Sequence, residues 1–220
     1  MLSILMPVYN GIEYINDSIS SILDQTYQDW ELIIGINGHQ PNSLVYQLAK
    51  DYELVDSRIR VFEYQEVTGK SATLNKMSES CNYDFVALID VDDIWLPTKL
   101  EKQVYFLKNG YDVVGTQCIY FGEMNGIVPS IPLNDISTYN FLQVNPIINS
   151  SSIIRKSECY WRPELNYYED YDLWLRLRKS EKKFFNIPEV LVKHRIHKTS
   201  AFNSTNTSQS LQDLLMSFSR

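Results

Sequence analysis

Three aspartates, Asp90, Asp92 and Asp93, follow directly on the apolar run 85–89. Carboxylates this close repel one another unless a cation offsets their charge. Mg²⁺ and Mn²⁺ take oxygen ligands and often join protein carboxylates to substrate phosphates. A short apolar run before Pro97 is typical of a buried strand, and ligands in open α/β sheets bind just beyond the carboxyl ends of strands. The pattern therefore favours a metal site over its alternative, a solvated acidic turn.

A second acidic group, Glu169, Asp170 and Asp172, opens a predicted helix over 170–179. Negative side chains in a first helical turn are favoured by the helix dipole, so helix capping alone would explain them. A carboxylate near a metal-bound electrophile can instead act as general base for an incoming hydroxyl. The sequence leaves both interpretations open.

Two of the three histidines in the chain, His194 and His197, lie close together with Arg195 and Lys198. Imidazole is a common metal ligand, and the two cations suit a phosphate group. A solvated basic loop after the last predicted strand is the alternative.

The first predicted strand ends at the segment 6–10, where Pro7 cannot donate to a sheet ladder and so marks the exit of the strand. Tyr9 and Asn10 would then face the ligand edge, where an aromatic ring can stack on a planar base. The segment 69–75 resembles a loop that enters a helix, whose N-terminus is a natural anion site. The chain has neither a P-loop frame nor a Gly-x-Gly-x-x-Gly dinucleotide fingerprint, which sets those two nucleotide-binding classes aside.

Strand and helix patterns alternate through the first half of the chain. Strands are expected at 3–9, 31–36, 58–64, 85–89 and 112–120, with helices at 11–25, 42–52, 70–81 and 99–108. This order predicts one α/β domain with a mostly parallel, mixed central sheet flanked by helices. The second half is less regular. A short helix is expected at 139–143, strands at 150–155 and 188–194, and a final amphipathic helix near 211–218.

The composition is that of one globular domain, with 220 residues, 44% hydrophobic and 21% charged. The net charge of -7 argues against a nucleic-acid-binding face. Cys81, Cys118 and Cys159 are far apart, which argues against a disulfide framework or a zinc site. A reducing cytoplasm is the simplest compartment, and no apolar stretch reaches the roughly 20 residues that span a bilayer.

Taken together and in order, these segments resemble the family 2 inverting glycosyltransferases with the GT-A fold. The resemblance covers about residues 3 to 200 and rests on the segments 3–10, 18–26, 30–34, 69–75, 88–93, 169–170 and His197. It implies transfer of a sugar from a nucleotide-diphosphate donor to an acceptor hydroxyl, with inversion. Residues 1–95 would then form the nucleotide-sugar-binding half and 96–200 the acceptor-side half, followed by a polar tail at 201–220.

The resemblance also implies roles by position. Donor binding falls to Pro7, Tyr9, Asn37, Lys70, Asn75, Asp90 and Asp92. Mn²⁺ or Mg²⁺ would be held by Asp92, with Asp93 as a second candidate and His197 as a further ligand. Asp170, with Glu169 beside it, matches the general base of a single displacement.

One position departs from the family pattern. After the second strand the family usually has two aspartates, and the second contacts the donor base, whereas this chain has Asn37. An amide can still bond a base edge because it both donates and accepts. A UDP-sugar is the favoured donor, and thymidine and guanine donors stay open.

The acceptor, which could be a glycan, a lipid-linked sugar or a protein, cannot be named from the sequence. Asn149, Ser151, Arg155 and Trp174 are expected on the acceptor side. A lipid-linked acceptor would place the enzyme peripherally at a membrane. Two other classes stay open: a Mg²⁺-dependent nucleotidyl or phosphoryl transferase, and a non-catalytic relative that binds a sugar nucleotide or a partner.

Overall fold

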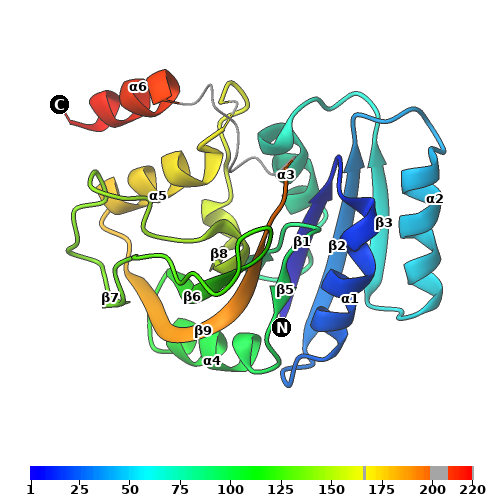
Figure 1. The fold of residues 1–220 in the computed structure, drawn as a ribbon, viewed down its shortest axis with the longest axis horizontal. Coiled ribbons are helices and arrows are strands. Elements are labelled where there is room, and N and C mark those ends of the chain that lie inside the picture. The colour runs from blue at the N-terminus through cyan, green and yellow to red at the C-terminus, as the bar shows by residue number, and fades with distance from the viewer. Residues whose placement is uncertain (166, 199–207, 220) are drawn as a thin grey trace.

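Four apolar runs of the first half form parallel strands, as the sequence predicts. They are β1 (Leu2–Val8), β2 (Trp30–Asn37), β3 (Ile59–Tyr64) and β4 (Phe85–Leu88). β1 pairs with β2 and β4, and β2 also pairs with β3. Every residue of β2 is buried, as expected for a parallel strand that is covered on both faces. The computed structural model describes residues 1–165, 167–198 and 208–219 (Figure 1).

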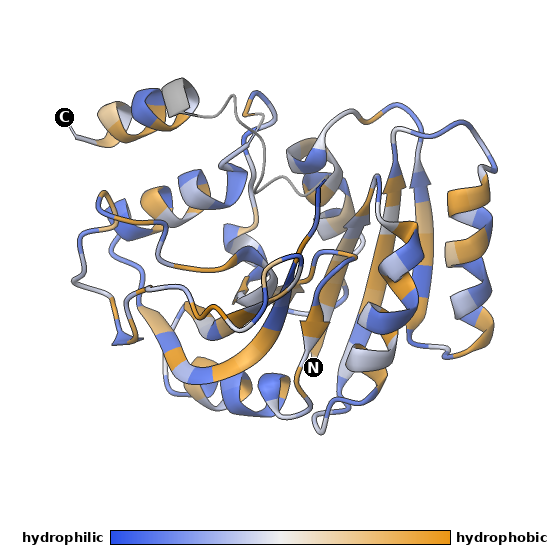
Figure 2. Cartoon of the chain, in the orientation of Figure 1, coloured by the Kyte–Doolittle hydropathy of each residue, from blue (hydrophilic) through white to orange (hydrophobic). Residues whose placement is uncertain are grey.

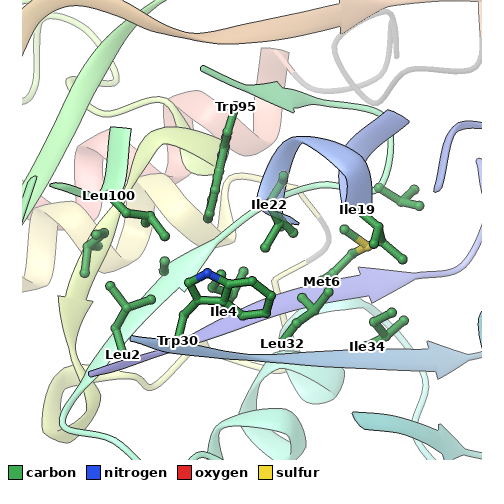
Figure 3. Close-up of a cluster of buried hydrophobic side chains, with 14 of the residues drawn as sticks. Leu2, Ile4, Met6, Ile19, Ile22, Trp30, Leu32, Ile34, Trp95 and Leu100 are labelled. Atoms are coloured by element: carbon green, nitrogen blue, oxygen red, sulfur yellow. The ribbon is translucent and has the colours of Figure 1, made fainter. Parts of the chain in front are cut away.

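Helices cover the two faces of this sheet. On one face lie α1 (Ile15–Leu23), α2 (Leu44–Lys50) and α4 (Lys99–Lys108), whose buried residues share one hydrophobic cluster with Ile4 and Leu32. On the other face lie α3 (Lys70–Glu79) and α5 (Glu169–Lys179), which share a cluster with Leu5 and Ile33. Neighbouring residues of each strand thus point to opposite faces. Figure 3 shows the first cluster, with Ile4 of β1 and Ile22 of α1 converging.

The second half of the chain extends the sheet and curls it. β8 (Ile153–Arg155) pairs antiparallel with β4 and β6 (Val113–Gly122), and β6 pairs parallel with the long β9 (Phe184–Ile196). β5 (Ile94–Trp95), which follows the acidic turn directly, pairs with the far end of β9. The order is β3-β2-β1-β4-β8-β6-β9-β5, with β7 (Asn134–Asp135) also on β9. The end of β9 is thereby brought to the acidic turn, and in Figure 1 β9 bends strongly.

Short 3₁₀ turns and a last helix complete the fold. The turns are η1 (Ile12–Tyr14), η2 (Asp51–Leu54), η3 (Asn149–Ser151) and η4 (Lys156–Glu158). α6 (Ser208–Phe218) packs through Leu214 on the same cluster as α5. Figure 2 shows that β1 and β2 are mostly hydrophobic and that the helices are two-sided in hydropathy. In the three described ranges, no helix is long and apolar enough to cross a membrane.

The expected helix at 139–143 is wrong. The segment forms isolated turns, in which Tyr139 N–H donates to Ile136 O and Gln143 N–H donates to Asn140 O. The side chain of Asn140 accepts from Leu142 N at 3.0 Å, and this local bond competes with helical pairing. The expected strand at 150–155 is divided between η3 and β8, and β9 begins before the predicted residue 188. The first seven residues of the predicted polar tail, 201–207, lie outside the described residues, whereas the predicted final helix is confirmed as α6.

Candidate active site

The turn after β4 sends its three carboxylates to three different partners. Asp93 N–H donates to Asp90 O at 3.1 Å, which closes the turn. Asp90 accepts from Lys70 Nζ at 2.6 Å, and Asn149 Nδ2 lies 3.4 Å from both of its oxygens. Burial would raise the pKa of Asp90, but the Lys70 ammonium outweighs it and lowers that pKa.

Lys70 joins the acidic turn to the start of α5. Its Nζ lies 3.7 Å from Glu169 Oε1 as well as 2.6 Å from Asp90 Oδ1. Burial would lower the pKa of Lys70, but these two carboxylates raise it, so the side chain is a fixed cation. The first residue of α3 therefore connects the end of β4 with α5.

Asp92 meets His197, which comes directly after β9. Asp92 Oδ2 lies 2.8 Å from His197 Nε2, and the side chains are 19% and 18% exposed. The pKa of Asp92 is raised, first by burial and then by the charges of Asp93 and Asp90. Excess negative charge beside an imidazole is a setting in which a divalent cation would be stabilised.

Asp93 is not available to a metal, which corrects the expectation that it is a second candidate ligand. Its side chain is completely buried, where it lies 2.9 Å from His194 Nδ1 and accepts from Arg195 N–H at 2.9 Å. Burial would lower the pKa of His194, but Asp93 raises it to about 9. Asp93 thus anchors the end of β9 to the acidic turn.

Arg195 holds the same junction from the other side. Its Nε donates to Asp92 O at 2.9 Å, and its guanidinium pairs with Asp17 at 2.8 Å. The guanidinium also lies 4.4 Å from the ring centroids of Tyr14 and Phe121. Because these partners belong to α1, η1 and β6, Arg195 fixes the direction in which the chain leaves β9 towards His197.

α1 fixes the acidic turn through a stripe of small polar side chains that sequence reasoning missed. Ser18 Oγ lies 2.6 Å from the carbonyl oxygens of Val91 and Asp93. Ser21 Oγ accepts from Trp95 N at 3.1 Å, and Gln25 bonds the backbone of the next turn. The signal was available, because residues 18, 21 and 25 recur at the helical spacing of the buried isoleucines.

Asp170 lies in the first turn of α5, after two non-glycine residues with left-handed backbone, Tyr167 (φ 83°) and Tyr168 (φ 57°). Strained conformations of this kind concentrate at functional sites. Asp170 Oδ1 accepts from Tyr171 N at 2.8 Å, and Oδ2 accepts from Asn145 Nδ2 at 3.1 Å. Burial, followed by the charge of Glu169, raises the pKa of Asp170 to about 6. A carboxylate in this range can accept a proton near neutral pH.

The other end of the site lies at the carboxyl ends of β1 and β2. Tyr9 is 57% exposed, and its ring covers Gly38 so closely that a Cβ there would lie 2.5 Å from the ring. Asn37 is buried at the last position of β2, and Pro7 lies in the neighbouring β1, where it pairs with Gly35. A cavity of about 360 Å³ opens here, lined by Tyr9, Asn10, Gly11, Ile12, Glu13, His39 and Val45. An exposed ring beside a cavity is suited to stacking on a planar base.

Four residues predicted for the site have other structural roles. Asn75 uses both ends of its amide on the backbone of Trp161, at 2.7 and 2.9 Å, so it joins α3 to that loop. Ser151 and Trp174 are completely buried, in η3 and in the core face of α5. Arg155 pairs with Phe85, at the opposite end of β4, and its guanidinium binds Asp112. Of the four predicted acceptor-side residues, only Asn149 lies at the site.

The described side chains could supply two of the ligands that a divalent metal needs. Within the described residues, no three His, Cys, Asp or Glu side chains converge into a metal site. Asp92 and His197 converge as a pair, and a carboxylate with an imidazole is an acceptable donor set for Mn²⁺. Such a site would need further oxygen ligands, which diphosphate oxygens and water commonly supply.

Solved structures identify the class of fold. Over 99% of this chain, it superposes on 66% of Staphylococcus aureus TarS 1–349 in complex with UDP-GlcNAc, with a TM-score of 0.78 and 15% identity. It also resembles the mannosyltransferase PcManGT from Pyrobaculum calidifontis in complex with GDP-Man and Mn²⁺, with a TM-score of 0.70 and 14% identity, over 90% of this chain and 58% of that one. The chain thus spans about two thirds or less of these solved chains, and its fold is that of the GT-A glycosyltransferases.

Sequence comparison gives the family. The model of glycosyl transferase family 2 matches residues 3–183. The O-antigen biosynthesis glycosyltransferase WbnJ of Escherichia coli is 33% identical over 214 residues, which cover 93% of this chain and 83% of WbnJ. The E. coli protein described as UDP-Glc:alpha-D-GlcNAc-diphosphoundecaprenol beta-1,3-glucosyltransferase WfgD is 29% identical over 91% of this chain and 79% of its own length. The chain belongs to glycosyl transferase family 2.

Proposed function

We propose that this protein transfers a sugar from a UDP-sugar to an acceptor hydroxyl, with inversion and with a divalent metal bound at Asp92 and His197. The observation that carries the proposal is the position of Lys70, whose Nζ lies 2.6 Å from Asp90 and 3.7 Å from Glu169. The carboxylates at the end of β4 and the start of α5 are therefore separated by one side chain. A diphosphate held at the first group would bring its sugar towards the second.

The donor would lie along the carboxyl edge of the sheet. Its base would stack on Tyr9, beside Asn37, and its ribose would be bound near Asp90. Lys70 would supply positive charge next to the diphosphate. A bound Mn²⁺ or Mg²⁺ would neutralise the charge that develops on the departing nucleoside diphosphate.

Asp170 would act as the base. Its carboxylate is half-buried, and two donors hold its two oxygens, so that it is oriented before an acceptor arrives. It would take the proton of the acceptor hydroxyl as that oxygen attacks the sugar from the face opposite the leaving group. One displacement then gives inversion without a glycosyl-enzyme intermediate.

Two comparisons favour a uridine donor, and the sequence relative is the stronger of the two. The relative WfgD is named for UDP-Glc as its donor, at 29% identity. The TarS complex contains UDP-GlcNAc, but at 15% identity it supports only the position of the donor in a shared fold. The relative WbnJ is named for O-antigen biosynthesis, and the name of WfgD contains alpha-D-GlcNAc-diphosphoundecaprenol, so we infer a glycan or lipid-linked acceptor.

Thermal unfolding against a panel of nucleoside diphosphates, with and without Mn²⁺, tests the donor site. A ligand at 100 times its dissociation constant adds about 2.7 kcal/mol, and for a domain of this size that raises Tm by roughly 5–10 °C. We expect this rise with UDP and Mn²⁺ together, and a smaller one with GDP or dTDP. Release of UDP from a UDP-sugar, lost in Asp170→Asn, would support transfer. Release of pyrophosphate would instead indicate a nucleotidyl transferase, and no response to any nucleotide would contradict the donor site.

A further inference from the structure

Among the described residues, Asn145 supplies the one side-chain hydrogen bond to the carboxylate of Asp170. Its Nδ2 donates to Asp170 Oδ2 at 3.1 Å, while Tyr171 N–H donates to Oδ1 at 2.8 Å. The carboxylate is therefore held at both ends, one by its own helix and one by the loop before η3. A carboxylate with one donor on each oxygen keeps lone pairs for a further hydrogen bond.

The loop that carries Asn145 is itself fixed from β9. Asn186, which is completely buried, donates through Nδ2 to Pro146 O at 2.7 Å and to Pro132 O at 2.7 Å. Pro146 also restricts the backbone of the residue before it, which is Asn145. The amide is thus presented to Asp170 by a segment with little freedom to move.

The amide makes this contact at a cost. Within the described part of the chain, Asn145 Oδ1 is buried and has no hydrogen-bond partner. An unpartnered buried carbonyl destabilises a fold, and each one calls for an explanation. Turning the amide over would set Oδ1 against a carboxylate oxygen, which is repulsive. The bond to Asp170 explains why a residue with an unpartnered oxygen lies here.

We propose that Asn145 is a positioning residue for the base, which orients the carboxylate of Asp170 and keeps it ionised for proton abstraction. This inference rests on the proposed function of Asp170. An amide N–H donated to a carboxylate favours the charged form, and it does so here against burial and against the neighbouring charge of Glu169.

The other groups that face Asp170 set the background for this effect. Glu169 on the same helix raises the pKa of Asp170, and Lys70 on α3 lowers it. The Tyr171 phenol is neutral at physiological pH, because burial and the charge of Asp170 raise its pKa to about 12. Asn145 differs from Glu169 and Lys70 because it bears no charge, so its removal changes one hydrogen bond and leaves the count of charges unchanged.

Two measurements on the full chain test the inference. The first is a ¹³C NMR titration of the Asp170 carboxyl in protein labelled at aspartate, assigned by comparison with Asp170→Asn. The second is the pH dependence of kcat/KM for sugar transfer. In Asn145→Ala we expect the Asp170 titration and the acid limb of kcat/KM both to move up by about one pH unit. Asn145→Leu, which keeps the size of the side chain, should do the same.

Asn140→Ala is the matched control. Asn140 lies in the same loop, and its side chain accepts only a local bond from Leu142 N, so its removal should leave both curves in place. Stabilisation by UDP with Mn²⁺ should stay unchanged in all three variants, because none touches the donor end of the site.

The outcomes separate the inference from the function beneath it. An Asp170 titration that is unchanged in folded Asn145→Ala and Asn145→Leu would overturn the inference. A wild-type protein that transfers no sugar would contradict the proposed function, but the NMR titration would still decide whether Asn145 controls ionisation. A fall in kcat/KM by the same factor at every pH, with the Asp170 titration unmoved, would indicate a structural role only and would also overturn the inference.

Discussion

His194 Nδ1 lies 2.9 Å from Asp93 Oδ2, in a pair whose carboxylate is fully buried. The neighbouring Asp92 is partly exposed and faces His197 at 2.8 Å. Two adjacent aspartates therefore have separate tasks: Asp93 ties β9 to the acidic turn, and Asp92 is the partly exposed carboxylate that we propose as the metal ligand.

This division predicts opposite behaviour for two variants. Asp93→Ala removes a buried carboxylate and leaves the half-buried His194 and the Arg195 N–H without their partner, and we expect it to lower the free energy of unfolding by about 3 kcal/mol. Asp92→Asn removes a carboxylate whose ionisation is already opposed by its neighbours, so stability should change by less than about 1 kcal/mol. Urea unfolding with and without UDP and Mn²⁺ measures both effects. In Asp92→Asn, Mn²⁺ should no longer add to the stabilisation that UDP gives. If Asp93→Ala is as stable as the wild type but is no longer stabilised by UDP with Mn²⁺, then Asp93, and not Asp92, is the metal ligand.

The raised pKa of Asp170 predicts that this residue costs stability at neutral pH. Its pKa is about 6 in the folded protein against 3.8 ordinarily, so folding favours the protonated form. Stability from this group is therefore present below about pH 4 and is lost as the pH rises through about 6. A two-unit shift corresponds to at most about 3 kcal/mol.

Asp170→Asn cannot ionise and should be more stable than the wild type by about 1–3 kcal/mol at pH 7.5. The difference should shrink to near zero at pH 4. Denaturant unfolding of both proteins at pH 4, 5.5 and 7.5 isolates this group, because the other carboxylates contribute equally to both. If the difference in stability between the two proteins is the same at every pH, the pKa of Asp170 is not raised by folding.

The sequence predicted β1 to β4 and their helices because each strand is a short apolar run followed by an amphipathic pattern. It could not predict that β9 begins at Phe184, because that strand is interrupted by Pro188 and charged residues and is defined by its pairing with β6. The family 2 assignment and the GT-A fold are confirmed, whereas the catalytic and donor roles stay predictions.

Within the site, the sequence could not predict which way adjacent side chains point. Asp92 and Asp93 are adjacent and identical in chemistry, and only the curl of the sheet decides which one meets His194. Trp174 is expected on the acceptor side from the sequence, and the structure buries it in the core face of α5. Asn145 carried no local signal, because its partner lies 25 residues further along the chain.

The contact between Ser18 and the acidic turn predicts that α1 controls donor binding without touching the donor. Ser18→Ala leaves the carbonyl oxygens of Val91 and Asp93 without their buried hydroxyl, which should cost about 1–3 kcal/mol of stability. Because the same turn carries Asp90 and Asp92, KM for the donor should rise several-fold. Ser20→Ala on the exposed side of α1 is the matched control and should change neither quantity. If Ser18→Ala is destabilised but its KM for the donor is unchanged, the contact contributes to stability and has no effect on donor binding.

Gly38 predicts a direct test of Tyr9 as the stacking surface for the donor base. The backbone of Gly38 has a φ of 74°, and a Cβ there would lie 2.5 Å from Tyr9 Cε2, against the exposed ring. Gly38→Ala must therefore displace the ring as well as strain the backbone. We expect UDP to bind about tenfold more weakly, measured by isothermal titration calorimetry in the presence of Mn²⁺.

Gly110→Ala separates the two effects of that substitution. Gly110 has a φ of 89°, and a Cβ there meets no heavy atom within 4 Å, so alanine brings comparable backbone strain without displacing a ring. Both variants should lose about 1 kcal/mol of stability, but only Gly38→Ala should lose affinity for UDP. Tyr9→Leu, which removes the ring and keeps Gly38, should weaken UDP to a similar extent. Full affinity in Gly38→Ala and Tyr9→Leu would place the base elsewhere than beside Tyr9.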